Sequence, residues 1–198
     1  MTNNIKNICV YASSSNDLAK IYYDEAEKLG TAIGQAGYNL VYGGSRRGLM
    51  YACASAVRKN GGKIIGIMPE RIAQMGCANP EDCDEFIMTK GMRERKALLD
   101  ERSEAAIAIA GGFGTLEEIS EIIVQKQLGY NNKPIVILNT ENFYNGLIIQ
   151  FEEMIRQNFA NKKSTNLYHI STSVEDVIDY INNYIPEKYE SKFVLNNA

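Results

Sequence analysis

The stretch AAIAIAGGFGTLEEISEIIVQKQL, residues 105–128, contains an apolar run, a glycine-rich turn and an amphipathic pattern in direct succession. The run Ala105–Ala110 predicts a buried strand, and the pattern from Thr115 to about Leu128 predicts a helix. Because the connection between them is short, the stretch predicts one strand–turn–helix unit of an α/β fold.

The same alternation of strand and helix continues along most of the chain. Apolar runs predict the strands, amphipathic patterns predict the helices, and glycines or polar residues separate them. The predicted strands cover residues 5–11, 38–42, 63–68, 85–89, 105–110 and 133–138, and the predicted helices cover 18–36, 49–59, 92–102, 115–128, 143–159 and 174–185. Residues 69–84 follow neither pattern, and we expect a surface loop there.

Strands that alternate with helices are joined by right-handed crossovers, which make neighbouring strands parallel. The central strand runs are continuously apolar, as is typical when helices cover both faces of a sheet. We therefore expect an α/β fold with a doubly wound parallel sheet and helices on both faces. Ligands of such folds bind beyond the carboxyl ends of the strands, near a change in strand order.

The composition is that of an ordinary globular protein. Of the 198 residues, 45% are hydrophobic and 23% are charged, which excludes a disordered or fibrous protein. The net charge of −3 argues against a nucleic-acid or membrane-surface protein, and no apolar run approaches the ~18 residues that span a bilayer. We expect one α/β domain over residues 1–198 with a frayed tail at 186–198, and neither a nucleic-acid nor a membrane partner.

Cysteine and histidine usage restricts the chemistry. The chain has one histidine, His169, and four cysteines, which are Cys9, Cys53, Cys77 and Cys83. We expect Cys9 and Cys53 to be buried, Cys77 and Cys83 to remain unpaired, and His169 to be a packing or surface residue. No zinc-type spacing is present, so no metal and no cofactor are expected. Free thiols and the lack of a signal-peptide pattern indicate a cytoplasmic protein.

Three turns each follow a predicted strand and precede a predicted helix. They are ASSSND at 12–17, GGSRRG at 43–48 and GGFGT at 111–115. Glycines let backbone N–H groups approach an anion, and the following helix N-terminus attracts negative charge. One such turn alone would be explained by chain reversal, but two glycine turns together with a serine turn favour a phosphate-bearing ligand.

Two familiar phosphate motifs fit poorly. Residues 43–48 have the glycine spacing of a P-loop, but Leu49 and Met50 stand where lysine and serine or threonine would be needed. A dinucleotide fingerprint would require GxGxxG after the first strand, where this chain has serines. A nucleoside triphosphatase and a dinucleotide-binding enzyme are therefore disfavoured.

Two carboxylates lie on one face of the helix that follows the GGFGT turn. Glu118, Glu121 and Gln125 are spaced for that face. Paired carboxylates beside an anion site can hold a raised pKa, which suits acid–base chemistry or stabilisation of an oxocarbenium ion. The alternative is that Thr115 and Glu118 form a helix-capping box. We expect Glu118→Ala to leave the fold nearly intact, apart from about 1 kcal/mol of stability for the lost cap.

Cations are concentrated where the helix 92–102 begins. Arg93, Arg95 and Lys96 oppose the helix macrodipole there, so helix stability does not explain them. A solvated, salt-bridged face is one explanation. A clamp for phosphate or for a leaving group is the other, and the neighbouring glycine turns favour it.

These residues resemble the "lonely guy" family of cytokinin riboside 5′-monophosphate phosphoribohydrolases, whose members are often labelled possible lysine decarboxylases. The resemblance covers roughly residues 5–185. It is carried by GGxxxGLM, MxxRK and PGGxGTxxE, which here are Gly43, Gly44, Gly48, Leu49 and Met50, then Met92, Arg95 and Lys96, then Gly111, Gly112, Gly114, Thr115 and Glu118. It implies a Rossmann-like α/β fold, a homodimer, and hydrolysis of N6-substituted adenosine monophosphate to free base and ribose 5-phosphate.

The resemblance also implies residue roles. Arg95 and Glu118 would be the catalytic pair, with Lys96 supporting Arg95 and Glu121 assisting at the ribose. The residues implied to bind the substrate are Ser14, Gly43, Gly44, Lys96, Gly111, Gly112, Gly114, Thr115 and Glu121. The chain departs from the family pattern at Ala110, at Tyr51, at Arg93 and in residues 69–84. The departures at Tyr51 and in residues 69–84 affect the size and identity of the base pocket that the resemblance implies.

Two other functions remain open at this point. A non-catalytic nucleotide-binding or sensing protein would use the same turns, although it would have no use for a carboxylate pair beside the anion. An enzyme that processes another ribosyl phosphate would use the same phosphate site. No residues indicate a pyridoxal-dependent decarboxylase, which would need a Schiff-base lysine and an acidic partner.

Overall fold

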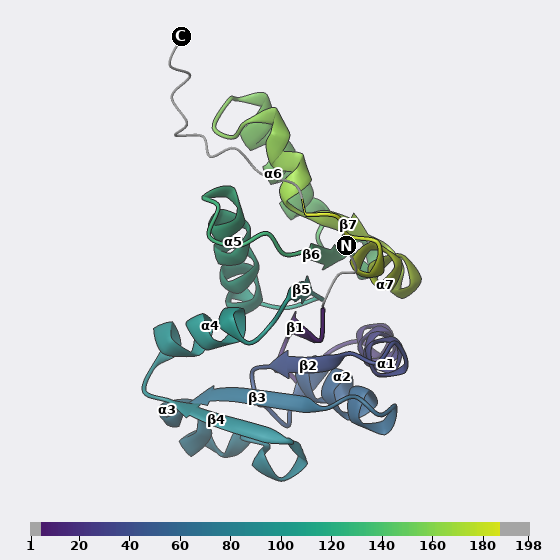
Figure 1. Cartoon of the computed structure of the whole chain (residues 1–198), viewed down its shortest axis with the longest axis vertical. Helices are drawn as coiled ribbons and strands as arrows, with labels where there is room; N and C mark the ends of the chain where they lie inside the picture. The colour runs from purple at the N-terminus through teal and green to yellow at the C-terminus, as the bar shows by residue number, and fades with distance from the viewer. Residues whose placement is uncertain (1–4, 187–198) are drawn as a thin grey trace.

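The computed structural model describes residues 5–186, which form a parallel sheet of seven strands (Figure 1). Along the sheet the order is β4-β3-β2-β1-β5-β6-β7. The strands are β1 (Asn7–Tyr11), β2 (Asn39–Tyr42), β3 (Ile64–Pro69), β4 (Glu85–Thr89), β5 (Ala105–Ala108), β6 (Ile135–Leu138) and β7 (His169–Ser171). Apart from residue 186, the tail expected to fray lies outside the described residues.

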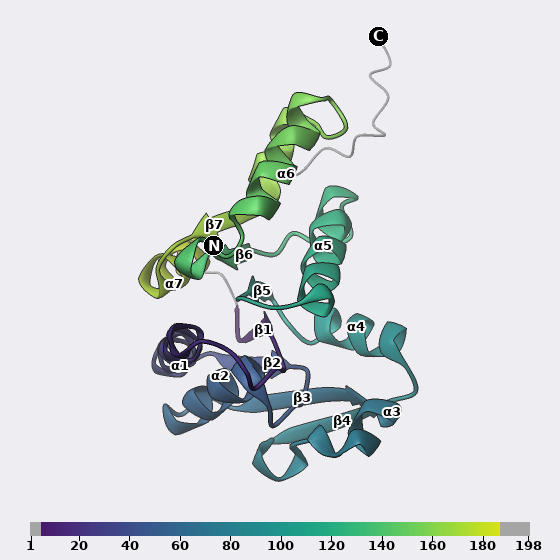
Figure 2. The ribbon, with the colours of Figure 1, turned by 180° about the vertical axis from the view of Figure 1, so that it is seen from behind.

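Helices cover both faces of the sheet, as predicted. They are α1 (Lys20–Gln35), α2 (Gly48–Lys59), α3 (Glu70–Ile72), α4 (Met92–Glu101), α5 (Phe113–Gln127), α6 (Asn145–Arg156) and α7 (Val174–Asn182). Helices α1 and α2 lie on one face of the sheet. They are behind β2 and β3 in Figure 1 and in front of these strands in Figure 2, which shows the molecule from behind.

The two faces of the sheet build two separate hydrophobic cores. Because successive strand residues point to opposite faces, Ile8 and Val10 of β1 pack with α1, α2 and α7, whereas Cys9 and Tyr11 pack with α4, α5 and α6. The central strands are therefore apolar at nearly every position, which explains the continuous runs in the sequence.

The direction of strand addition changes at β1. Its neighbours are β2 on one side and β5 on the other, so the chain winds outward from the centre of the sheet in both directions. The loops that leave the carboxyl ends of β1 and β5 consequently diverge, and a crevice opens between them. The expected doubly wound fold is confirmed.

Two elements differ from the predictions. Strand β7 was not predicted, because its three residues are too few to show a periodic pattern. Residues 69–84 are not a surface loop: they contain α3, a π-helical turn over Ala73–Cys77 and a 3₁₀ turn over Pro80–Asp82. Long-range contacts order this segment, since the backbone N–H of Asn79 donates to the carbonyl of Gly44 at 3.0 Å and the Asn79 side chain is buried.

The predicted start of α5 is also wrong. The helix begins at Phe113, two residues earlier than predicted, and its N-cap residue is Gly112. Thr115 therefore lies inside the first turn, and no side chain caps the helix. The capping-box explanation for Glu118 is contradicted, because a capping box requires its serine or threonine at the N-cap position.

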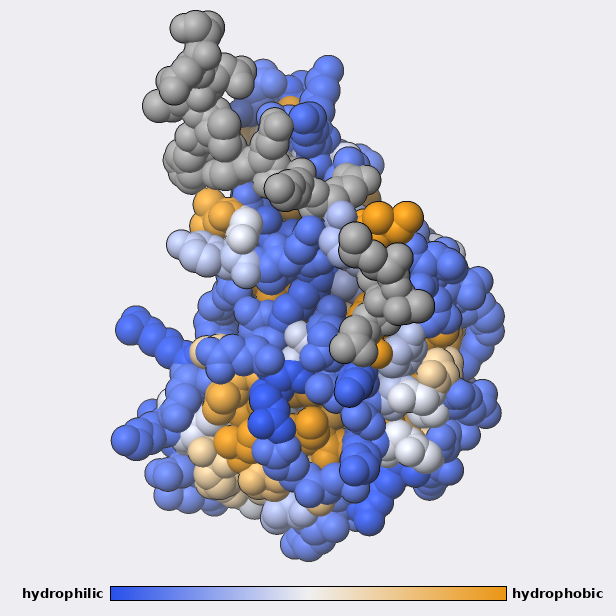
Figure 3. Space-filling model, viewed as in Figure 1, coloured by the Kyte–Doolittle hydropathy of each residue, from blue (hydrophilic) through white to orange (hydrophobic). Residues whose placement is uncertain are grey.

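The cysteines are as predicted. All four are free, and Cys9 and Cys53 are buried. Within residues 5–186, no helix combines the length and the apolar content that crossing a membrane would require. Figure 3 shows apolar side chains gathered over β2 and β3 beside α4, on the face that α1 and α2 do not cover.

Candidate active site

A pocket of about 520 Å³ lies at the carboxyl ends of the central strands. The loops that follow β1, β2, β3 and β5 line it, together with side chains from α4 and α5. This is the position that the change in strand order at β1 predicts for a ligand.

The predicted site residues divide into two groups. Those that line the pocket are Ser14, Gly43, Arg95, Gly112, Gly114, Thr115 and Glu118. Those that lie outside its wall are Gly44, Lys96, Gly111 and Glu121. The three turns therefore meet at one pocket, but not every residue of their motifs faces it.

The serine turn is joined to both glycine turns. The N–H of Met50 donates to the carbonyl of Ser13 at 3.2 Å, and the N–H of Ser13 donates to the carbonyl of Ala110 at 3.3 Å. Gly48 has a φ of 59° and lies against the backbone of residues 13–15, where a Cβ atom would be 2.5 Å from the Ser15 carbonyl oxygen. Only glycine fits this close approach in a left-handed conformation.

The N-terminus of α5 opens onto the pocket through Gly112, Gly114 and Thr115. The first N–H groups of any helix have no intrahelical acceptor, and here no side chain accepts from them. Gly111 supports the turn from behind, since a Cβ atom at this position would overlap the Thr115 side chain. This arrangement can bind an anion through backbone N–H groups and the helix dipole.

Arg95 and Glu118 form a buried ion pair in the pocket wall. Their side chains are only 7% and 5% exposed, and Nη1 of Arg95 donates to Oε1 of Glu118. Nε of Arg95 also donates to the Ile67 carbonyl at 3.3 Å. Gly43 makes room for the guanidinium, because a Cβ atom there would lie 2.5 Å from its Nη2.

Burial raises the pKa of Glu118, and the neighbouring Arg95 lowers it, with a net increase above the ordinary value. The spacing of Glu118 and Glu121 in the sequence predicts a raised pKa through repulsion between the two carboxylates. The direction is right, but desolvation is the main cause, and the repelling carboxylate is Glu117.

Lys96 and Glu121 lie behind the pocket wall. Nζ of Lys96 bonds Glu117 and also lies 2.7 Å from Oε2 of Glu121. Hydrogen bonds to Glu117 and Glu121 raise the pKa of Lys96. A small cavity of about 10 Å³ contacts Lys96, Glu118, Glu121 and Gln125. The predicted helix face with Glu118, Glu121 and Gln125 therefore exists. Of these three residues, Glu118 lines the large pocket.

Other pocket residues escaped the sequence reasoning. The apolar part of the wall is rich in sulfur, with Met50, Met68, Met75, Cys77 and Met92. Met75 and Cys77 come from the segment 69–84. Contacts with residues far away in the sequence determine the fold of this segment, so its sequence shows no local helix or strand pattern. Arg47 also lines the pocket, and its place in the GGSRRG turn was the available signal.

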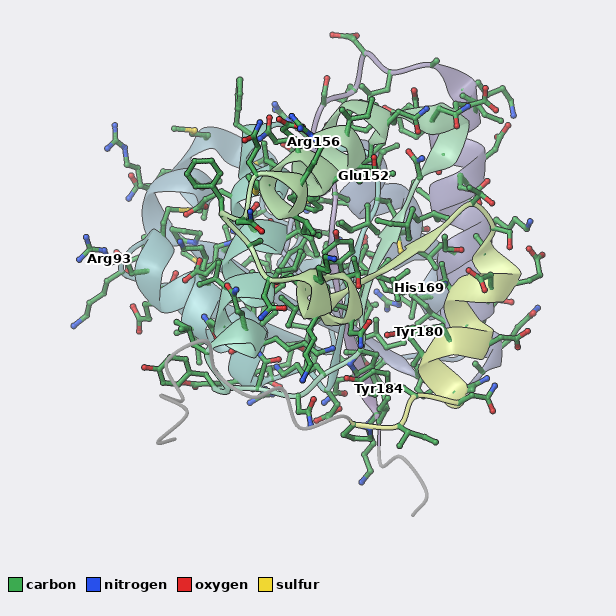
Figure 4. All side chains as sticks on the ribbon, turned by 90° about the horizontal axis from the view of Figure 1, so that it is seen from above. Arg93, Glu152, Arg156, His169, Tyr180 and Tyr184 are labelled. Atoms are coloured by element: carbon green, nitrogen blue, oxygen red, sulfur yellow. The ribbon has the colours of Figure 1, made fainter. Side chains whose placement is uncertain are left out.

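His169 is a packing residue, as predicted. Its ring stacks on Tyr180 with centroids 4.3 Å apart and bonds the carboxylate of Asp176 at 2.7 Å (Figure 4). It does not line the pocket. Over the described part of the chain, no cluster of three histidine, cysteine, aspartate or glutamate residues is arranged to hold a metal ion.

Comparison with known proteins gives two kinds of relative. Residues 50–181 match the family model described as "Possible lysine decarboxylase". The chain is 34% identical to cytokinin riboside 5′-monophosphate phosphoribohydrolase LOG1 of Arabidopsis thaliana, over 94% of this chain and 88% of the relative. It is 33% identical to the probable enzyme LOGL2 of Oryza sativa subsp. japonica, over 94% and 77%.

Solved structures with the same fold have lower sequence identity. The molybdenum cofactor carrier protein of Chlamydomonas reinhardtii has a TM-score of 0.68 at 22% identity, over 90% of this chain and 96% of that chain. The molybdenum cofactor binding protein of Rippkaea orientalis has a TM-score of 0.67 at 24% identity, over 90% and 97%. At these identities the likeness establishes the fold alone.

Proposed function

Because the chain belongs to the "lonely guy" family of cytokinin riboside 5′-monophosphate phosphoribohydrolases, we propose that it hydrolyses the N-glycosidic bond of adenosine 5′-monophosphate or an N6-substituted relative. The products are the free base and ribose 5-phosphate. The observation that carries this proposal is the buried Arg95–Glu118 pair in the wall of a pocket at the carboxyl edge of the sheet.

The proposed reaction breaks the bond between C1′ and the base nitrogen. The electron pair of that bond goes to the base, which takes up a proton, and water supplies the hydroxyl group that C1′ receives. The ribosyl centre becomes cationic on the way, and a carboxylate held in a partly desolvated wall stabilises such a charge strongly. Glu118 takes this role and orients the water, while Arg95 holds the carboxylate in place and polarises the phosphate or the base.

The 5′-phosphate binds at the N-terminus of α5. Backbone N–H groups of Gly112, Gly114 and Thr115 and the hydroxyl of Ser14 are the donors in this proposal, and the uncapped helix end supports it. Lys96 acts indirectly, by neutralising Glu117 and Glu121 behind the catalytic pair. The ribose contact expected for Glu121 has no support from the pocket wall of this chain.

The apolar, sulfur-rich part of the wall is the place for the base and for an N6 substituent. Methionine side chains adapt to ligands of different shape, which suits an alkyl group. Met50, Met68 and Met75 face the pocket there, next to Ile72.

The test compares base release by the wild type with two matched variants. Protein is incubated with adenosine 5′-monophosphate and with N6-substituted analogues, and free base is separated by chromatography. We expect Glu118→Gln to lower the rate about a hundredfold or more. Glu117→Gln is the control, since Glu117 is the exposed neighbour that pairs with Lys96 outside the pocket.

Full activity of Glu118→Gln, or an equal loss in Glu117→Gln, would contradict the assignment of Glu118. Nucleotide binding without any base release from the wild type would contradict hydrolysis. That result would support the alternative of a non-catalytic nucleotide-binding protein with this fold.

We further propose that the protein is a cytoplasmic homodimer with one nucleotide site in each domain. The four free thiols support a reducing compartment. Exposed apolar side chains on α4 and in the first turn of α5 support the dimer: Phe113 is 92% exposed, and Met92 and Leu116 are also exposed. Figure 3 shows a further apolar area over β2 and β3, next to α4. Exposed apolar areas of this kind are typical of protein–protein interfaces.

A further inference from the structure

Arg47 lies in the pocket wall, in the turn that leads from β2 into α2. Its side chain is exposed, and within residues 5–186 no carboxylate forms an ion pair with it. The neighbouring Arg46 differs, because its guanidinium bonds the Ala78 carbonyl and the carboxylate of Glu81. The two adjacent arginines therefore differ in their surroundings. Arg46 stabilises the segment 69–84, whereas these contacts do not account for the presence of Arg47 in the pocket wall.

Arg47 gives the described pocket wall a net positive charge. Its charged side chains are Arg47, Arg95 and Glu118. Arg95 and Glu118 neutralise each other as a buried pair. The guanidinium of Arg47 is the charge that remains, so the pocket attracts an anion. A phosphate monoester, with a charge of about −1.5 to −2 at pH 7, is such an anion.

The backbone holds Arg47 beside the serine turn. Its own N–H donates to Oγ of Ser45 at 3.2 Å, and the N–H of Gly48 donates to Oδ1 of Asn16 at 3.0 Å. On its other side the serine turn is bonded to Ala110, which precedes the GGFGT turn that leads into α5. Arg47 and the N-terminus of α5 thus adjoin the same short loop and line the same pocket.

We propose that Arg47 binds the 5′-phosphate of the nucleotide, together with Ser14 and the N-terminus of α5, and so makes the protein select nucleotides over nucleosides. A guanidinium presents parallel N–H donors that match two phosphate oxygens. The inference rests on the nucleotide site of the proposed function and does not depend on the hydrolytic step. Arg47 is a binding residue here, while the catalytic pair remains Arg95 and Glu118.

The test is a binding measurement by titration calorimetry with three probes. Adenosine 5′-monophosphate carries base and phosphate, adenosine lacks the phosphate, and ribose 5-phosphate lacks the base. We expect Arg47→Ala to weaken binding of the two phosphorylated probes about 10- to 100-fold, as the loss of a charge-assisted hydrogen-bonded contact does. Adenosine binding stays within about twofold, because adenosine carries no phosphate to lose.

Two further variants separate a specific contact from a general charge effect. Arg93→Ala removes the same charge from an exposed side chain of α4 that projects away from the protein (Figure 4) and does not line the pocket. We expect it to bind all three probes like the wild type. Arg47→Lys keeps the charge but loses the paired donors, so its affinity for the phosphorylated probes falls between wild type and Arg47→Ala.

The assignment would be overturned if Arg47→Ala weakened adenosine as much as its monophosphate, or if it bound the monophosphate like the wild type. An equal loss in Arg93→Ala would also overturn it. Since binding is measured and not turnover, a protein that binds nucleotide without releasing base would refute the proposed hydrolysis and leave the role of Arg47 to be decided by these same titrations.

Discussion

Glu118 is held between two opposing influences. Desolvation raises its pKa, and the ion pair with Arg95 lowers it, with a net increase. The proposed reaction needs the ionised carboxylate beside the ribosyl cation. Activity therefore depends on the protonation of Glu118, and Arg95 helps to set the pH at which activity changes because it lowers the pKa of Glu118.

We predict an acid limb of kcat/KM at a pH above 4.5, the ordinary pKa of a glutamate. Activity is lost as the pH falls through the raised pKa, because protonation removes the negative charge. Arg95→Met should move the limb to still higher pH, whereas Arg95→Lys keeps the positive charge and moves it less. Initial rates measured from pH 4 to 9 check this, and a limb at or below 4.5 in the wild type would mean that another group titrates.

The structure also changes the expectation for Glu118→Ala. A lost helix cap would cost about 1 kcal/mol, but Glu118 does not cap α5. Its removal leaves the buried guanidinium of Arg95 without its carboxylate, and breaking one partner of such a pair costs about 3–5 kcal/mol. Glu118→Gln is the better variant, because the amide oxygen still accepts a hydrogen bond from Arg95.

At the scale of elements, two glycines decide how α1 packs on α2. Gly30 and Gly34 lie one turn apart on α1, and both are buried against the backbone of α2. A Cβ atom at Gly34 would lie 2.7 Å from the carbonyl oxygen of Val57. The helices approach closely because these positions have no side chain, and α2 is the helix that follows the GGSRRG turn.

We predict opposite effects of one substitution at two helical glycines. Gly34→Ala should destabilise the protein by about 1–3 kcal/mol, because the added methyl group overpacks the α1–α2 contact. Gly146→Ala on α6 should stabilise it by up to about 1 kcal/mol, since a Cβ atom there meets nothing within 4 Å. Thermal unfolding measures both effects. A Gly34→Ala protein as stable as the wild type would contradict the prediction, because the helices would then accommodate the added methyl group without cost.

The segment between β3 and β4 is the element that local patterns predicted least well. Arg46 bonds the Ala78 carbonyl and Glu81, and the side chain of Asn79 donates to the hydroxyl of Tyr42 at 3.3 Å. These partners lie more than thirty residues away in the sequence. The segment contributes Ile72, Met75 and Cys77 to the pocket, so long-range contacts determine the apolar end of the site.

At the scale of the whole molecule, the proposed dimer covers the exposed apolar side chains Met92 of α4 and Phe113 and Leu116 of α5. We predict that the wild type runs as a dimer in size-exclusion chromatography with light scattering, and that Phe113→Glu shifts it toward the monomer by placing a charge in the interface. Phe159→Glu is the control, because Phe159 is 84% exposed and lies after α6, not on α4 or α5. A monomeric wild type, or equal dissociation in both variants, would contradict this dimer.

The sequence by itself determined the parallel sheet with helices on both faces and the meeting of three turns at one edge. These properties follow from local patterns, since continuous apolar runs, helical periodicity and glycine turns act within a few residues. The carboxyl ends of parallel strands share an edge, so the position of the site followed as well.

Only the tertiary structure decided which of the motif residues line the pocket. The order of the strands brings α4 beside α5, and burial then joins Arg95 to Glu118 while Lys96 holds Glu117 and Glu121 behind the wall. Among residues 5–186 it also left the side chain of Arg47 in the pocket wall without an ion-pair partner and tied Arg46 to the segment after β3. Such partners are chosen by distance in space and by the cost of burying an unpaired charge, and no local pattern in the chain encodes either.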